Sequence, residues 1–276
     1  MAGARLDQIG YWSEIKLDIV RKYAVAYSTV LAKQWGIRSH AYVDAFAGAG
    51  THISKTTGDF VSGSPLNALL VQPPFREFHF IDLDGGRAKR LQTIAGDRAN
   101  VFVHEGDCNN VLLETVFPRV RYRDYRRALC LLDPYALNLK WEVMKTAGQE
   151  KSIEIFLNFM VMDINMNVLK HDRSKVQPEQ IARMNAFWGD SSWEDAGYST
   201  SEGLFGAMES KSSNEVLAQA FKKRLQDVAG FAYVPDPIPM RNTTGATIYY
   251  LFFASPNKTG AKIVTEIFNI FRNRGS

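Results

Sequence analysis

Residues 41–50 are Ala-Tyr-Val-Asp-Ala-Phe-Ala-Gly-Ala-Gly, an apolar strand that ends in an acidic residue and a glycine turn. Gly48 and Gly50 let the chain turn sharply and let a ligand approach the backbone, because no Cβ stands in the way. Asp44, at the strand end, can face that ligand. Only two glycines are present and no Gly-Lys-Ser/Thr follows them, so the pattern favours S-adenosylmethionine over a nucleoside triphosphate or a dinucleotide. A plain strand-to-helix connection is the alternative.

Strands and helices alternate along the first 160 residues. A helix is predicted at residues 13–35, before the glycine-turn strand, and a hydroxyl-capped helix at residues 64–71, after it. Further strands are predicted at residues 76–82, 101–105, 128–133 and 153–158, with helices at 84–95, 111–117 and between the last two strands. This alternation predicts an α/β fold with a doubly wound, mostly parallel sheet and helices on both faces.

The pattern changes after residue 158. Residues 160–213 combine helical segments with a Ser/Gly/Trp-rich stretch, and we interpret them as a helical insertion or substrate lobe within a single domain of residues 1–276. A helix around residues 216–228, a Pro-rich turn at 235–239 and a strand at 247–254 follow. Two late strands around a turn predict an antiparallel edge hairpin, and an amphipathic helix at 263–271 is expected to pack on the sheet.

The composition is that of an ordinary globular protein. Hydrophobic residues make up 46% and charged residues 22%, and no long apolar run suits a membrane. The first residues lack the pattern of a secretory signal, so a cytoplasmic protein is expected. Two cysteines are too few for a disulfide framework or zinc cluster, and the five histidines lack metal-ligand spacing, so no metal is expected.

The net charge of +4 is mildly basic, and one segment concentrates it. This arginine segment, residues 119–127, alternates arginines with apolar and aromatic residues ahead of a predicted strand. A solvated connector and a phosphate-contacting patch are both consistent with it.

Four acids stand directly after four successive strands: Asp44, Asp82, Asp107 and Asp133. The carboxyl ends of the strands of a doubly wound sheet converge on one crevice, where ligands bind. Asp82, after the second strand, can accept both ribose hydroxyls, and Asp107 is placed to accept from the adenine amino group. Each acid taken alone could instead be a helix cap. The predicted cofactor-binding residues are Asp44, Phe46, Ala47, Gly48, Gly50, Asp82, Leu83, Asp107, Cys108, Asp133 and Pro134.

Asp133-Pro134-Tyr135 follows the apolar fourth strand and resembles the Asp-Pro-Pro-Tyr type of motif of amino-methyltransferases. In those enzymes the acid and a backbone carbonyl accept hydrogens from the nucleophilic amine, and the aromatic ring stacks on the base that carries it. The resemblance implies catalytic roles for Asp133 and Tyr135, and Ser64, Tyr135 and Asn158 are predicted to bind substrate. Here the second proline is missing and the tyrosine comes one position early.

The chain as a whole resembles the three-Cys-motif partner (TcmP) family, a methyltransferase-like group. The matching segments cover roughly the first 160 residues: Tyr-Trp-Ser-Glu-Ile-Lys-Leu at 11–17, the glycine-turn strand, Gly-Ser-Pro at 63–65, Phe-Ile-Asp at 80–82 and Leu-Asp-Pro-Tyr at 132–135. The family usually has glycine where this chain has Ala136. The resemblance implies a class I methyltransferase fold, S-adenosylmethionine as cofactor and an association with a three-cysteine radical enzyme.

The leading hypothesis is a methyltransferase that acts on a nucleobase, nucleotide or nucleoside-like acceptor, including nucleic acid. The polar segment Thr51 to Gly63 is expected to be a loop that closes over the site. The alternative is a partner or scaffold protein for the radical enzyme, with little methyltransferase activity of its own. A Rossmann dehydrogenase is disfavoured, because no Gly-x-Gly-x-x-Gly is present.

Overall fold

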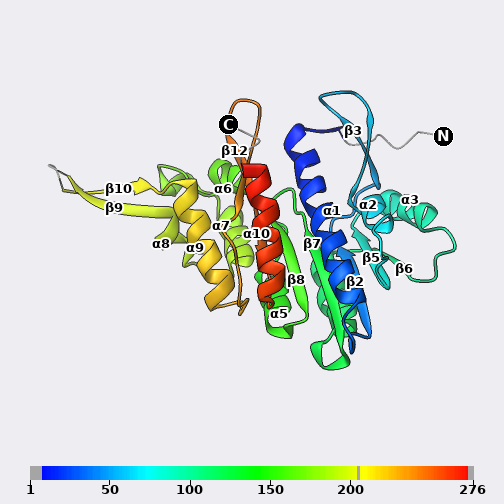
Figure 1. The fold of residues 1–276 in the computed structure, drawn as a ribbon. Coiled ribbons are helices and arrows are strands. Elements are labelled where there is room, and N and C mark those ends of the chain that lie inside the picture. Colours follow the sequence, from blue (N-terminus) through cyan, green and yellow to red (C-terminus); the bar gives the residue numbers. More distant parts are fainter. Residues whose placement is uncertain (1–7, 204–205, 273–276) are drawn as a thin grey trace.

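A computed structural model describes residues 8–203 and 206–272 of the chain. The helices and strands alternate as the sequence predicts, with most boundaries within two or three residues of those expected (Figure 1). The strands of the main sheet are β2 (Ser39–Asp44), β5 (Glu77–Asp82), β6 (Val101–Glu105), β7 (Arg126–Leu132), β8 (Ile153–Phe159), β11 (Ile238–Arg241) and β12 (Thr247–Ala254). The helices that cover it are α1 (Tyr11–Ala32), α2 (Ser64–Leu69), α3 (Gly85–Ala95), α5 (Trp141–Glu150), α6 (Val161–Asn167), α7 (Pro178–Trp188), α9 (Asn214–Asp227) and α10 (Lys258–Arg272).

The seven strands lie in the order β11-β12-β8-β7-β2-β5-β6. β2, β5, β6, β7 and β8 pair in parallel, whereas β12 runs antiparallel to both β8 and β11. This is an α/β fold with a doubly wound, mostly parallel sheet, so the predicted fold class is confirmed, including the antiparallel edge hairpin. The hairpin turn lies at residues 242–246, not at the Pro-rich segment, because Ile238–Arg241 is itself the edge strand.

Alternate residues of the central strands face opposite layers of helices. Tyr42 of β2 belongs to the core layer that includes residues of α1, α2, α3 and α10, whereas its neighbour Val43 belongs to the layer that includes residues of α5, α6, α7 and α9. Both side chains are about fully buried, because a parallel sheet between two helical layers has no solvated face. Figure 1 shows α1 and α10 side by side across the near face of the sheet.

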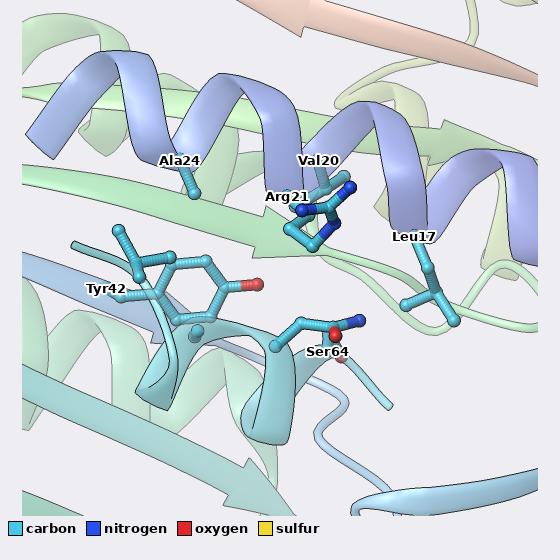
Figure 2. A pocket seen from close by; sticks show the side chains of 9 residues that line it. Leu17, Val20, Arg21, Ala24, Tyr42 and Ser64 are labelled. Atoms are coloured by element: carbon cyan, nitrogen blue, oxygen red, sulfur yellow. The ribbon is translucent and has the colours of Figure 1, made fainter. Parts of the chain in front are cut away.

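The contact between α1, α2 and β2 is close-packed. Leu17, Val20 and Ala24 of α1 face Tyr42 and the beginning of α2 across a narrow seam (Figure 2). The gap left between them is about 10 Å³, which is room for about one water molecule. This seam therefore fixes α1 on the sheet and leaves no space for a ligand.

The segment at residues 160–213 is only partly the helical insertion that was predicted. α6, α7 and the short α8 (Trp193–Gly197) are helical, but β9 (Tyr198–Gly203) and β10 (Gly206–Lys211) form an antiparallel hairpin that extends away from the sheet (Figure 1). Residues 198–211 are rich in Ser, Glu and Gly and carry no helical stripe of apolar residues, so local pairing of two strands satisfies their backbone groups.

The prediction that residues 51–63 form a loop is wrong. β3 (Thr51–Ser54) and β4 (Phe60–Ser62) form an antiparallel hairpin, and β1 (Gln8–Ile9) extends it in parallel with β3. Ser64 was also expected to cap the following helix, but Gly63 occupies the N-cap position and no side chain caps α2. Among the described residues, no helix is both long and apolar enough to cross a membrane.

Candidate functional site

A cavity of about 720 Å³ lies at the carboxyl ends of β2, β5, β6 and β7, where the sequence predicted the ligand crevice. Eight predicted site residues line this crevice: Phe46, Gly48, Asp82, Leu83, Asp107, Cys108, Asp133 and Tyr135. Six others do not line it: Asp44, Ala47, Gly50, Ser64, Pro134 and Asn158. Lining residues that sequence reasoning missed are Ala45, His52, Asp84, Arg87, Gly106, Asn109, Asn138 and Lys140.

Glycine is required at positions 48 and 50 for different structural reasons. Both have positive φ, +64° at Gly48 and +79° at Gly50, a region that other residues rarely adopt. Gly48 borders the crevice. Gly50 instead faces α3, where an added Cβ would lie 2.5 Å from Cδ1 of Ile94. The positive φ and the contact with Ile94, and not ligand approach, therefore explain Gly50. Ala47 is buried and donates its backbone N–H to the Ile81 carbonyl at 2.9 Å.

Asp82 is fixed by the two loops that border the crevice. One carboxylate oxygen accepts from the backbone N–H of Gly48 and the other from that of Asp84, both at 2.9 Å. Each carboxylate oxygen has lone pairs left for a second donor. Asp84 caps α3 by accepting from the Arg87 N–H at 2.8 Å, as predicted. Asp82 is thus rigid and can still accept two vicinal hydroxyls.

Asp107 is both a helix cap and a residue of the crevice wall, the two alternatives that the sequence left open. Its Oδ1 accepts from the backbone N–H groups of Asn109 and Asn110, at 2.8 and 3.3 Å, so it is a helix cap. It also lines the crevice beside Cys108. Burial raises the pKa of the Cys108 thiol to about 12, and a neutral thiol is a poor nucleophile.

Asp133 lies at the centre of a network that joins three distant segments. Lys16 of α1 donates to Oδ2 of Asp133, and Asn158 of β8 donates to Oδ1. The Lys16 and Asp133 side chains are only 9% and 24% exposed, so this ion pair is largely removed from water. The Lys16 ammonium also lies 5.8 Å from the ring centroid of Tyr249 on β12. Sequence reasoning missed Lys16, although it lies within the segment that resembles the TcmP family.

The loop from Asp133 to Lys140 is held by two side chains from other elements. Asn109 accepts from the Lys140 N–H at 2.7 Å and donates to the Asn138 carbonyl at 3.1 Å. Asp163 of α6 accepts from the Leu137 N–H at 3.2 Å. Tyr135, in this loop, is 78% exposed at the rim of the crevice. Its ring is therefore available to stack on a planar ligand.

Asp44 lies below the crevice and not in its wall. Burial is the main cause that raises the pKa of Asp44 to about 7, and the nearby charge of Asp133 acts in the same direction. Interactions with the Ser64 side chain and the Phe46 backbone N–H, the latter at 3.3 Å, favour the charged form. Asp44 and Ser64 thus support the glycine turn from within the protein.

The arginine segment lies at the opposite edge of the sheet. Arg126 and Arg127 begin β7, whose carboxyl end carries Asp133. Arg126 pairs with Glu77 at 3.0 Å, the Arg119 guanidinium lies 4.7 Å from the Phe102 ring, and that of Arg127 lies 4.1 Å from the Tyr122 ring. The arginine segment therefore contributes no phosphate contact to the crevice. Across residues 8–203 and 206–272, no cluster of three or more His, Cys, Asp or Glu residues could hold a metal ion.

Solved structures are similar to this chain in fold. Protein LPL1258 from Legionella pneumophila str. Philadelphia 1 matches with a TM-score of 0.55 and 11% identity, over 97% of this chain and 94% of its own. An S-adenosylmethionine-dependent methyltransferase from Clostridium acetobutylicum ATCC 824 gives 0.41 and 10%, over 86% and 91%. Another from Mesorhizobium loti gives 0.38 and 10%, over 83% and 97%. No protein-family model and no curated protein matches the chain.

Proposed function

We propose that this chain is an S-adenosylmethionine-dependent methyltransferase that acts on a nucleobase, nucleotide or nucleoside-like acceptor. The observation that carries the proposal is the Asp133 network at the wall of the crevice, where Lys16 and Asn158 hold a carboxylate beside the exposed ring of Tyr135. This unit offers an acceptor for an amine hydrogen next to a stacking surface.

The residues of the crevice suit the proposed cofactor. The volume of about 720 Å³ is within the range of small-molecule and cofactor sites. Asp82 is fixed where it can accept the ribose hydroxyls, and Asp107 keeps an oxygen that accepts no hydrogen bond from the described residues and can face an adenine amino group. Gly48 allows close approach of the backbone, and Leu83 and Phe46 add apolar surface. S-adenosylmethionine bound there would supply the electrophilic methyl group.

The chain's own residues would act mainly by alignment. An exocyclic amine attacks with its nitrogen lone pair, so it needs its N–H groups oriented and not removed beforehand. Asp133 can accept one of these hydrogens, and its ion pair with Lys16 holds the carboxylate in place. Tyr135 would hold the plane of the base, because aromatic stacking tolerates any base. The β3/β4 hairpin, which places His52 in the crevice wall, is the element that could exclude water.

We also propose that the chain belongs to the TcmP family and associates with a three-cysteine radical enzyme. One observation favours a binding role without turnover: the Asp133 carboxylate is already paired with the Lys16 ammonium and with Asn158, so an acceptor amine would have to share its oxygens with them. If the ion pair persists when an acceptor is present, the chain would serve as a cofactor-binding partner protein. Transfer of a labelled methyl group to a panel of nucleosides, nucleotides and short RNA strands distinguishes the two roles.

Calorimetry with S-adenosylmethionine and its demethylated product tests the cofactor assignment. Asp82→Ala should weaken binding by about 1.5 to 3 kcal/mol, roughly one to two decades in affinity, because two charge-assisted hydrogen bonds are lost. Asp84→Ala is the matched control, since this neighbouring acid also borders the crevice but its carboxylate caps α3. Equal affinity of the wild type and Asp82→Ala would refute the ribose assignment.

A further inference from the structure

A second cavity, of about 400 Å³, lies at the amino-terminal edge of the sheet, opposite the crevice. It is formed where β7 and β8 begin, where β12 ends, and where α1 ends and α10 begins. None of its lining residues borders the crevice. The proposed methyltransferase chemistry therefore makes no use of it.

Three cations line this second cavity: Arg127, Lys151 and Lys258. Within residues 8–203 and 206–272, no carboxylate forms an ion pair with any of them. The one acid in the wall, Glu154, is buried and accepts hydrogen bonds from the hydroxyls of Tyr23 and Ser255. Burial raises the pKa of Glu154 to about 7, so it adds less than a full negative charge near neutral pH. The cavity is therefore positive.

Two hydroxyls in the wall are buried and have no hydrogen-bond partner within residues 8–203 and 206–272. They are Oγ of Ser152 and the hydroxyl oxygen of Tyr27, which are inaccessible to solvent in residues that are 1% and 6% exposed. Because no water-sized atom reaches either oxygen, these two hydroxyls belong to the packed wall and are not ligand contacts. The three cations suit the oxygen atoms of an anion.

Aromatic rings complete the wall. Tyr122 and Tyr233 are 55% and 36% exposed, and the guanidinium of Arg127 lies 4.1 Å from the Tyr122 ring centroid. Such a ring and guanidinium form a flat platform on which a base can stack. Tyr122 also borders the neighbouring hollow, which two arginines, Arg121 and Arg123, and one acid, Glu150, line.

We propose that this cavity is a second binding site that takes the phosphate group of a nucleotide. Arg127 and Lys258 contact the phosphate, and the rings of Tyr122 and Tyr233 contact the base. A free nucleotide and a nucleotide within an RNA strand present the same phosphate chemistry. For the strand, Arg121 and Arg123 would contact the next phosphate.

Calorimetry of the full chain with AMP, adenosine and a tri-adenylate RNA tests the proposal. AMP should bind at least about tenfold more tightly than adenosine, since the phosphate makes the charged hydrogen bonds. Lys258→Gln and Arg127→Gln should each weaken AMP binding about tenfold.

Two matched variants give the controls. Lys262 lies one turn further along α10 than Lys258, is exposed and is outside the cavity, so Lys262→Gln should not change the affinity for AMP. Lys140 borders the crevice, so Lys140→Gln should also leave the affinity for AMP at the second cavity unchanged. Equal effects of Lys258→Gln and Lys262→Gln, weakening only by Lys140→Gln, or no binding of AMP and tri-adenylate at millimolar concentration would each overturn the proposal.

The RNA arm identifies the source of the phosphate. Equal affinities for AMP and tri-adenylate, both lowered by Lys258→Gln, support a site for one nucleotide. Tighter binding of tri-adenylate that is lost in the double variant Arg121→Gln/Arg123→Gln supports a strand that continues into the neighbouring hollow.

Discussion

The ion pair between Lys16 and Asp133 can be tested by a double-mutant cycle. Lys16→Met keeps the length of the side chain and most of its packing but removes the ammonium that faces Asp133. The carboxylate then retains Asn158 as its donor but loses its counter-charge. Asp133→Asn removes the opposite charge, and the double variant removes both.

The expected magnitude follows from the burial of the pair. Breaking a fully buried pair by removing one partner costs about 3 to 5 kcal/mol, because a charge is left without compensation. Asp133 is 24% exposed, so water can partly solvate it, and we expect Lys16→Met to lower the free energy of unfolding by about 2 kcal/mol. The double variant leaves no uncompensated charge, so its loss should be smaller than the sum of the two single losses by at least about 1 kcal/mol.

Urea denaturation of the four proteins measures this coupling, and a methyl-transfer assay with the substrate panel accompanies it. Lys22→Met is the matched control, because Lys22 is in the same helix and pairs with Asp18 at 3.2 Å but is 38% exposed. It should cost less than about 1 kcal/mol. Additive losses for Lys16→Met and Asp133→Asn, to within about 0.5 kcal/mol, would show that the pair is not coupled and that Lys16 does not position Asp133.

Three further predictions concern other parts of the molecule. Glu154 has a folded-state pKa of about 7 against an ordinary value of 4.5, so between these pH values the folded protein binds more protons than the unfolded chain. The free energy of unfolding should therefore fall by up to about 3 kcal/mol as pH rises through this range. Urea denaturation at pH 5 and pH 8 should show a smaller fall for Glu154→Gln than for the wild type. The β3/β4 hairpin should gain protection in hydrogen exchange when cofactor and substrate are added, and unchanged protection would contradict its role as a lid. Tyr135→Ala should weaken binding of a base-containing acceptor by about 1 to 3 kcal/mol while the melting temperature stays the same, because the ring is 78% exposed; an equal loss for an acceptor without a base would exclude stacking.

The parallel part of the fold could be predicted because its signals are local. The apolar strand at residues 39–44 and the amphipathic helices each show their periodicity within a few residues, and the right-handed connections of a parallel sheet leave few arrangements. The polar segments 51–63 and 198–211 were harder. They carry no apolar period, and their hairpins are held by pairing between strands, which a single segment does not encode.

Part of the crevice wall could also be predicted from local signals in the sequence. Asp82 and Asp107 come directly after strands, and parallel strands bring their carboxyl ends to one edge, so position in the chain was enough to place both in the wall. Asp44 met the same criterion but is fully buried and does not line the crevice. The arginine segment was left open between a solvated connector and a phosphate patch, and it lies at the opposite edge because it precedes its strand.

The sequence by itself determined the order and type of the sheet-forming elements and the edge at which the acids gather, because both depend on short-range periodicity. Only the tertiary structure decided which distant side chains meet. Lys16 and Asp133 are 117 residues apart, and the pair forms because α1 packs across the sheet against β12 and α10 and brings its inner face to the end of β7. The second cavity likewise forms where the ends of five separate elements meet, and no local sequence pattern shows how such ends converge.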